Sequence, residues 1–162
     1  MYRPLQLKIL VLLLVLFTAS CAPSTPQTST PVTEKELDEV IEQAHGSIET
    51  LFQAMLAPKP SYDFLGLKVR FSTQDGGYDD NWVEPLDYYD GKFTVRMMDI
   101  LTYNTNLQTD RTLQVPLKKV VDWMIVEKDG TLIGGYTIRL AYEHMSPDEK
   151  KEFLRVTGYK LK

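Results

Sequence analysis

The residues of this 162-residue chain that are best suited to ligand chemistry lie near two predicted turns. They combine aromatic rings with opposite charges, and they are Trp82, Glu84, Asp122, Trp123, Tyr136 and Arg139. Aromatic side chains with one apolar side and one wet end suit either the rim of a core or a ligand groove. In one interpretation both tryptophans fill the core and Arg139 pairs with Asp122 or Glu84. In the other, a shallow groove stacks its rings on a sugar or peptide, and Arg139 binds a carboxylate through two hydrogen bonds.

The motifs of nucleophilic catalysis and phosphate binding are missing from the sequence. No serine lies in a strained elbow of the GxSxG type, and no glycine-rich phosphate loop is present. We therefore favour a non-catalytic binding or structural module of the cell envelope. One alternative is a hydrolase that acts on envelope material through Glu84 and Asp122, which requires a raised pKa on one of them. Another is an inhibitor or partner subunit of an envelope protein, which predicts an exposed apolar patch on the sheet or at Tyr88-Tyr89.

Neither a metal nor an organic cofactor is expected from this composition. Zinc requires three or four ligands, whereas the chain offers only His45 and His144 besides Cys21, a cysteine that we expect to carry lipid. We expect a structural role for both histidines. The acidic residues of 75–81 lack the spacing of a calcium loop and predict a solvated turn. Nucleic acid is not expected as a partner, because phosphate binding needs a clustered basic face and the chain has 22 acidic against 18 basic residues.

An apolar segment precedes Cys21, the only cysteine of the chain. Arg3 and Lys8 are followed by an apolar run of about 11 residues, which is too short to span a membrane as a helix. The small residues 18–20 before Cys21 resemble the lipobox of bacterial lipoproteins, in which a peptidase cuts before a cysteine that carries lipid. The Cys21 thiol also has no second cysteine with which to form a disulfide. We therefore predict a signal peptide over residues 1–20 and lipidation of Cys21.

The predicted anchor also predicts where the chain resides. A lipid on Cys21 places a lipoprotein on a membrane, facing the periplasm, or on the extracytoplasmic surface if the organism has one membrane. Ala22 favours the outer over the inner membrane, since an aspartate at this position is the best-known signal for retention in the inner one. Residues 21–33 are rich in Pro, Ser and Thr and predict a disordered linker to a single globular domain over residues 34–162. The expected partners are the membrane and an envelope protein, peptide or glycan.

A helix is predicted directly after the linker. Thr33 and Glu36 have the spacing of a capping box, which predicts the N-terminus of a helix. Apolar residues then recur at spacings of three and four as far as Pro58. Gly46 inside this segment costs about 1 kcal/mol relative to alanine. The pattern predicts one amphipathic helix that ends before Pro58.

Strands are predicted to follow the helix. Apolar and polar residues alternate over 65–72, which is typical of a half-buried strand. A second strand is predicted over 82–89, where Pro85 indicates an edge position or a bulge. Asp90-Gly91 predicts a tight hairpin into a third strand over 93–97.

The C-terminal part combines a hairpin with helices. Residues 102–112 predict a polar loop, and 120–127 and 131–133 predict two strands joined by a turn. Residues 136–145 fit a helix, although their first three would also suit a strand, and we favour the helix. A capping box and a closing glycine predict a last helix over 146–158. The predicted fold is α+β: an N-terminal amphipathic helix on a mostly antiparallel twisted sheet of about 4–6 strands, with one or two short C-terminal helices.

Several short motifs resemble one protein family in their order. They are KVRF at 68–71, WVE at 82–84, DWM at 122–124 and GGYTIR at 134–139, preceded by Ala44, Leu51 and Phe52. From about Asp38 onward the chain resembles domain-of-unknown-function family 2314, the YegJ-like proteins. The resemblance implies no established reaction, substrate or cofactor. Several members of that family look like lipoproteins or secreted proteins, which agrees with the prediction for Cys21.

Overall fold

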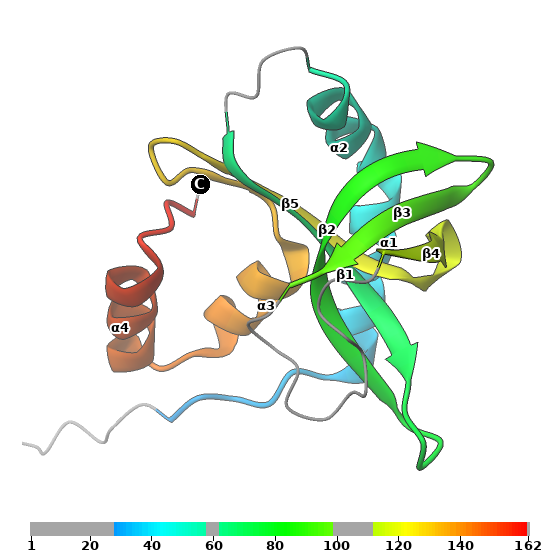
Figure 1. Cartoon of the computed structure of the whole chain (residues 1–162). Helices are drawn as coiled ribbons and strands as arrows, with labels where there is room; N and C mark the ends of the chain where they lie inside the picture. Colours follow the sequence, from blue (N-terminus) through cyan, green and yellow to red (C-terminus); the bar gives the residue numbers. More distant parts are fainter. Residues whose placement is uncertain (1–27, 58–61, 99–111, 162) are drawn as a thin grey trace, which may run out of the picture.

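The chain forms a six-stranded antiparallel sheet in the order β4-β3-β2-β1-β5-β6, in a computed structural model that describes residues 28–57, 62–98 and 112–161. The helices are α1 (Glu34–Gly46), α2 (Ile48–Met55), α3 (Tyr136–His144) and α4 (Pro147–Thr157), with a short 3-10 helix η2 (Leu117–Lys119). The strands are β1 (Tyr62–Ser72), β2 (Tyr78–Tyr89), β3 (Lys92–Met97), β4 (Thr112–Pro116), β5 (Val120–Glu127) and β6 (Leu132–Gly134). The predicted α+β class is confirmed, with α1 and α2 along the sheet and α3 and α4 beyond β6 (Figure 1).

The N-terminal helix begins as predicted but breaks earlier than predicted. The amide of Glu36 donates to the Thr33 hydroxyl at 3.3 Å, and the Thr33 amide donates to the Glu36 carboxylate at 2.8 Å, which confirms the capping box. The chain then breaks at Ser47, whose hydroxyl donates to the Gln43 carbonyl at 2.7 Å and so competes with the helical hydrogen bonds. The prediction of one continuous helix is therefore wrong. Gly46, which has a low helix propensity, is the last residue of α1.

The long hairpins of the sheet follow the predicted turns. Asp90 and Gly91 have φ angles of 49° and 74°, in the left-handed region that a two-residue hairpin requires, so the predicted turn between β2 and β3 is confirmed. The register of this pair shifts between Pro85 and Asp87, which confirms the predicted bulge. The alternative of an edge position is wrong, because β2 lies inside the sheet between β1 and β3.

The main core lies between the sheet and the helices α1 and α2. Leu51 of α2 and the strand residues Leu67, Val83 and Phe93 are completely buried there. Trp123 of β5 joins them, and its indole Nε1 donates to the carbonyl of Ala44 in α1 at 2.9 Å. This hydrogen bond ties the first helix to the sheet. Of the two tryptophans predicted to fill the core between sheet and helix, Trp123 does so, whereas Trp82 is half-buried on the opposite face of the sheet.

A sharp reversal at two glycines carries the chain from β6 into α3. Gly134 and Gly135 have φ angles of 69° and 63°, and a Cβ on Gly134 would lie 2.4 Å from the carbonyl oxygen of Trp123. The helix favoured for residues 136–145 is confirmed as α3. The capping box of α4 and its closing residue Gly158 are confirmed as well. The predicted loop over 102–112 lies almost wholly outside the described residues.

The end of the predicted linker contacts the domain. The amide of Thr30 donates to the carbonyl of His144 at 2.9 Å, and the Thr30 hydroxyl lies 2.9 Å from Nδ1 of the same histidine. Nε2 of His144 lies 3.0 Å from the Glu36 carboxylate. His144 therefore has the expected structural role, and Thr30, within the predicted linker, is held against the domain. Residues 1–20 and Cys21 lie outside the described residues.

The described helices are short. Among residues 28–57, 62–98 and 112–161, no helix has both the length and the apolar character needed to cross a membrane.

Candidate functional site

The structure divides the six residues of the predicted groove between two faces of the sheet. Trp123 is 1% exposed on the face covered by α1 and α2, where its ring lies 6.0 Å from that of Tyr136. Because side chains alternate along a strand, Trp82, Glu84 and Asp122 point to the opposite face. These side chains therefore do not line one groove, although the structure describes all of them. Ligand binding by any one of them stays a prediction.

Asp122 lies where β5 meets the start of α3. Its Oδ1 accepts hydrogen bonds from the amides of Trp123 at 2.7 Å and Tyr136 at 3.1 Å. Its Oδ2 accepts from the amide and the hydroxyl of Thr137, at 2.7 and 2.8 Å. Gly135, at the N-cap position of α3, has no side chain that could accept the free amides of the first turn. The Asp122 carboxylate therefore caps α3 from the neighbouring strand.

Lys68 of β1 completes this cluster, and we call Asp122, Thr137 and Lys68 the Asp122 junction. Lys68 Nζ donates to the Thr137 hydroxyl at 3.2 Å. Burial raises the pKa of the Asp122 carboxyl against the opposing effect of its hydrogen bonds, and burial lowers the pKa of Lys68. A raised pKa is what the hydrolase alternative requires. Here, however, the carboxylate is completely buried and both oxygens serve the cap.

The other two charged residues of the predicted groove also have structural partners. Glu84 pairs across β2 and β3 with Arg96, whose Nε and Nη2 lie 2.8 and 2.6 Å from one carboxylate oxygen. Arg139 donates to the carbonyls of Gly134 at 2.9 Å and Leu132 at 2.6 Å, which holds α3 against β6. The predicted ion pair of Arg139 with Asp122 or Glu84 is wrong, because in the described structure neither carboxylate forms an ion pair with Arg139.

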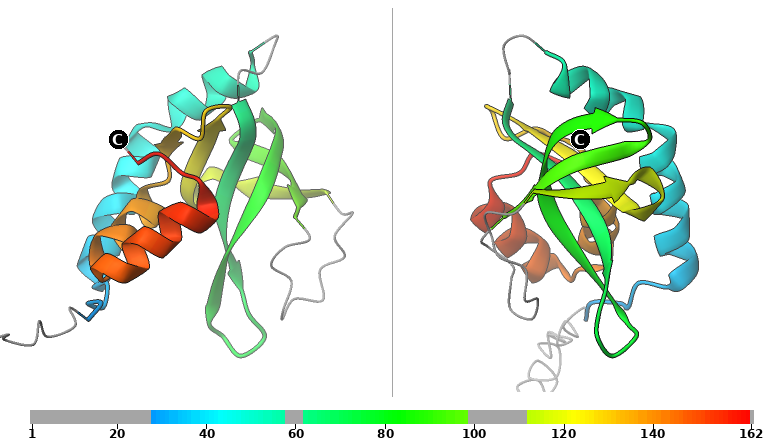
Figure 2. Two further views of the ribbon diagram at one scale, coloured as in Figure 1. Left: turned by 90° about the vertical axis from the view of Figure 1, so that its left-hand side faces the viewer. Right: turned by 45° about the vertical axis from the view of Figure 1, so that its right-hand side comes forward.

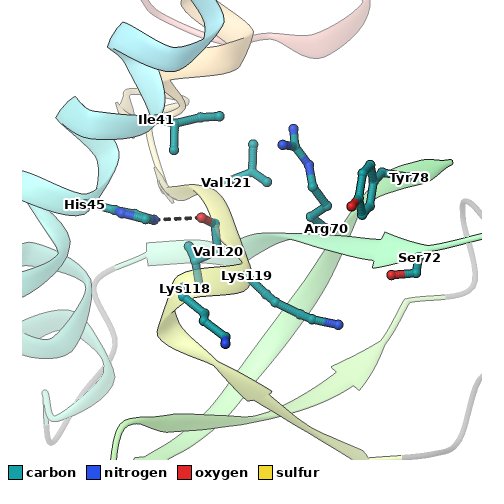
Figure 3. A pocket seen from close by; sticks show the side chains of 9 residues that line it. All are labelled: Ile41, His45, Arg70, Ser72, Tyr78, Lys118, Lys119, Val120 and Val121. Atoms are coloured by element: carbon teal, nitrogen blue, oxygen red, sulfur yellow. Dashed lines mark hydrogen bonds between the residues drawn. The ribbon is translucent and has the colours of Figure 1, made fainter. Parts of the chain in front are cut away.

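A second group of charged residues surrounds a pocket of about 300 Å³ between α1, the β1–β2 hairpin and η2 (Figure 3). We call the lining residues His45, Arg70, Tyr78, Lys118 and Lys119 the cationic pocket. They come from α1, the β1–β2 hairpin and η2, three segments that are far apart in the sequence. The fold therefore gathers positive charge at this one point of a chain with a net charge of −4.

Arg70 and Tyr78 form one wall of the cationic pocket (Figure 3). Nε and Nη2 of Arg70 donate to the two carboxylate oxygens of Asp80 at 2.8 and 2.9 Å, a bidentate pair that fixes the guanidinium. Asp80 also raises the pKa of Arg70. The guanidinium carbon lies 5.9 Å from the centre of the Tyr78 ring, and this tyrosine is 68% exposed. The wall thus presents a fixed cation next to an exposed aromatic face.

Lys118 and Lys119 line the same pocket from η2. Pro116 precedes this short helix, and Val120 after it returns the chain to the sheet as the first residue of β5. Both lysines are exposed, and neither forms an ion pair with a carboxylate of the described residues. His45 Nε2 donates to the Val120 carbonyl at 2.7 Å, which ties α1 to the base of η2. The histidine thus has the expected structural role and also borders the pocket.

An acidic surface adjoins the cationic pocket on the other side of Arg70 and Tyr78. This second hollow, of about 460 Å³, shares these two residues. Its carboxylates are those of Glu34, Asp38, Asp79 and Asp80. The wall therefore separates a positive from a negative surface, so an anion is attracted to the lysine side only. In the described part of the chain, no group of three His, Cys, Asp or Glu side chains is placed to hold a metal ion.

Sequence reasoning did not identify the cationic pocket. Its lysines stand in a short basic dipeptide, and its tyrosine belongs to the acidic segment 75–81 that predicts a solvated turn. Arg70 is predicted only as a polar position on a half-buried strand. The signal in the sequence is the pair Lys118-Lys119 in an otherwise acidic chain. Its proximity to Arg70 depends on a register shift between Lys68 and Val69 where β1 pairs with β5.

Comparison with known proteins identifies a family. No curated protein and no solved structure matches the chain. A family model described as "Uncharacterized protein conserved in bacteria (DUF2314)" matches residues 34–161, which include every helix and strand described above. That range also contains the motifs of the predicted resemblance, which is thereby confirmed. The chain therefore belongs to the bacterial family DUF2314.

Proposed function

We propose that this protein is a lipid-anchored binding module of the bacterial envelope, whose cationic pocket binds a carboxylate-bearing glycan or peptide without catalysis. The observation that carries the proposal is that Arg70, Lys118 and Lys119 line one pocket together with the exposed ring of Tyr78. Exposed aromatic faces stack on sugar rings and peptide groups, while cations bind carboxylates.

The ion-pair pattern indicates which charges are available to a ligand. Arg70 is held by Asp80 and has a fixed direction, whereas Lys118 and Lys119 have no carboxylate partner in the described structure. Two lysines that contribute no internal ion pair add only self-repulsion to the free protein, and a bound anion relieves it. The pocket therefore favours an anionic ligand whose carboxylate reaches the lysines and whose body contacts Tyr78.

The non-catalytic part of the proposal rests on the carboxylates. Asp122 is buried as a helix cap, and Glu84 is paired with Arg96. Neither lines the cationic pocket. A hydrolase that used Asp122 would have to break the cap of α3, and one that used Glu84 would have to break the ion pair with Arg96.

Calorimetric titration of the full chain with a soluble muropeptide that bears free carboxylates tests the binding proposal. We expect saturable binding that weakens as salt increases. The double variant Lys118→Gln/Lys119→Gln should reduce affinity by about tenfold or more, on the order of 1.4 kcal/mol. Lys128→Gln is the matched control, because this exposed lysine lies in the turn between β5 and β6, outside the pocket. Equal affinities of the double variant and the control would contradict the proposal.

The anchor is the second part of the proposal, and it is supported by the sequence around Cys21. We expect the chain to fractionate with membranes, to incorporate labelled palmitate, and to reach the outer membrane in organisms that have two membranes. Cys21→Ser should abolish both labelling and membrane association while leaving the folded domain intact. A Cys21→Ser chain that remained in the membrane fraction would show that the anchor is wrong.

A further inference from the structure

An apolar groove lies between α2 and β2, away from the cationic pocket. Phe52, Met55 and Leu56 of the α2 region line one side, and Leu86 and Tyr88 of β2 line the other. The volume is about 300 Å³, which suits one or two large side chains. We call these five residues the α2–β2 groove.

The floor of the α2–β2 groove is rigid. The ring centres of Phe52 and Tyr88 lie 4.5 Å apart. Both rings pack against Phe93, a completely buried residue of β3, with ring centres 5.6 and 4.7 Å away. Aromatic groups held in such a cluster have few alternative rotamers. A side chain that enters the groove therefore meets a surface that is already ordered, and the entropy cost of binding is correspondingly low.

Exposed apolar side chains concentrate around this groove. Leu56 and Leu86, on the two sides of the groove, are 77% and 42% exposed. Single exposed leucines are normal on protein surfaces, but a cluster over a pocket marks an interaction site. An exposed apolar patch at Tyr88-Tyr89 is what the partner-subunit alternative predicts from the sequence.

The charge at the edge of the groove indicates the kind of partner. Glu49 and Asp87 line it, and neither forms an ion pair with a cation of the described residues. Glu49 accepts a hydrogen bond from Gln53 at 2.6 Å, and Asp87 accepts one from the Tyr88 amide at 2.8 Å. Carboxylates beside an apolar groove attract a segment that carries lysine or arginine next to a large apolar side chain.

The position of the groove favours a protein over a lipid surface. Residues 28–33, which lead to the predicted anchor, leave at one end of the molecule, whereas α2 lies at the opposite end in every view (Figures 1 and 2). The groove therefore lies at the end of the domain that is distant from the proposed anchor at Cys21. Two carboxylates at its edge also disfavour an anionic bilayer surface.

We infer that the α2–β2 groove binds a short segment of a partner protein, with one large apolar side chain in the groove and a basic residue against Glu49 and Asp87. Leu86 and Leu56 supply the apolar contact, and the two carboxylates select the charge. The inference concerns a different surface from the cationic pocket and does not depend on ligand binding there.

Panning of a random 12-residue peptide display library on the full chain tests this inference. We expect the selected peptides to combine a large apolar residue with Lys or Arg. The best of them should lose about tenfold or more in affinity against Leu86→Ser or Leu56→Ser. Glu49→Gln/Asp87→Asn should remove the preference for basic peptides over the same peptides with Glu in place of Lys and Arg.

Val156→Ser is the matched control, because Val156 is an equally apolar side chain, 67% exposed, on the distant helix α4. Circular dichroism melts of each variant separate a lost contact from lost folding. Selected peptides that bind Leu86→Ser, Leu56→Ser and Val156→Ser equally well would overturn the inference. So would a concentration-dependent dimer, or binding to anionic vesicles, that Leu86→Ser abolishes, since either shows another occupant. Lys118→Gln/Lys119→Gln should leave peptide binding unchanged, which keeps this test separate from that of the cationic pocket.

Discussion

The Asp122 junction and the cationic pocket both contain charged residues, yet the fold uses the two sets in opposite ways. At the junction, four hydrogen bonds satisfy the Asp122 carboxylate, and the group is completely buried. At the pocket, Lys118 and Lys119 are exposed and have no carboxylate partner among the described residues. The buried charge holds two elements together, whereas the exposed charges contribute nothing that the fold requires.

This difference shows why a perturbed pKa is a poor guide to function in this molecule. The pKa of Asp122 is raised because the carboxyl is buried, and the hydrogen bonds from Trp123, Tyr136 and Thr137 oppose that shift only in part. A buried helix cap is sufficient to explain such a shift. Charges that the fold leaves unpaired are the better indication of a ligand here.

The largest expected effect is on stability, at the junction. Asp122→Ala leaves the amides of Tyr136 and Thr137 without an acceptor in a buried site, which should lower the free energy of unfolding by about 3 kcal/mol. Urea denaturation measures the change. Asp63→Ala, at an exposed position of β1, is the control and should alter stability by less than about 0.5 kcal/mol. Similar values for the two variants would show that the cap is unimportant.

A smaller loss of stability is expected where β5 meets α1. Trp123→Phe removes the indole donor from the Ala44 carbonyl and leaves a small cavity, which should lower the free energy of unfolding by about 2 kcal/mol. The same denaturation assay applies. Trp82→Phe is the natural comparison, because Trp82 is only half-buried and lies on the other face of the sheet. A larger loss of stability for Trp82→Phe than for Trp123→Phe would show that the main core lies on the face of the sheet that carries Trp82.

A fall in pH should stabilise the folded chain through Asp122 and destabilise it through the surface carboxylates. Hydrogen bonds lower the pKa values of Glu36, Glu149 and Asp129, so these groups stabilise the fold above the pKa of the unfolded chain. That stability should be lost progressively as pH falls below about 5 and through the lowered pKa values of the folded chain. The raised pKa of Asp122 has the opposite consequence, because protonation of this group favours the folded state as pH falls.

Melting temperatures measured as the pH is lowered test both the destabilising effect of the surface carboxylates and the stabilising effect of Asp122. Asp129→Asn should flatten the loss of stability in acid, because it removes one carboxylate with a lowered pKa. Asp122→Asn should make the loss steeper, because it removes the one opposing contribution named here. Parallel curves for the two variants and the unmodified chain would contradict this assignment.

The smallest expected change in stability is at the cationic pocket. Lys118→Gln/Lys119→Gln should alter the free energy of unfolding by less than about 0.5 kcal/mol, since both side chains are exposed and unpaired within the described residues. Chemical denaturation of this double variant beside Asp122→Ala gives the comparison directly. A loss of 2 kcal/mol or more, roughly the scale of a buried polar defect, would show that the fold does need these lysines.

The sequence predicted most of the fold because its local signals are strong. The capping boxes at Thr33 and Ser146 and the turn at Asp90-Gly91 fix element boundaries through a few adjacent residues. The break at Ser47 was missed because the apolar spacing continues across it, while the side chain of Ser47 competes for the helix backbone. Pro85 is compatible with either an edge strand or a bulge, and only the order of the strands, which places β2 inside the sheet, selects the bulge.

The site could not be predicted in the same way because it depends on distant pairings. Asp122 and Trp123 are adjacent in the sequence, but strand alternation sends them to opposite faces, so they cannot share a groove. Arg70 and Lys119 line one pocket only because of the register of β1 against β5. Residue types indicate available chemistry, whereas the register decides which residues share a surface.

The most direct test of the central claim is to map where an anionic ligand binds. Backbone amide shifts of the full chain, recorded while a carboxylate-bearing muropeptide is added, report the contact surface residue by residue. The cationic pocket predicts shifts at His45, Arg70, Tyr78, Lys118 and Lys119 that disappear in Lys118→Gln/Lys119→Gln. Shifts confined to Trp82 and its neighbours on the other face of the sheet, unchanged in that double variant, would contradict it.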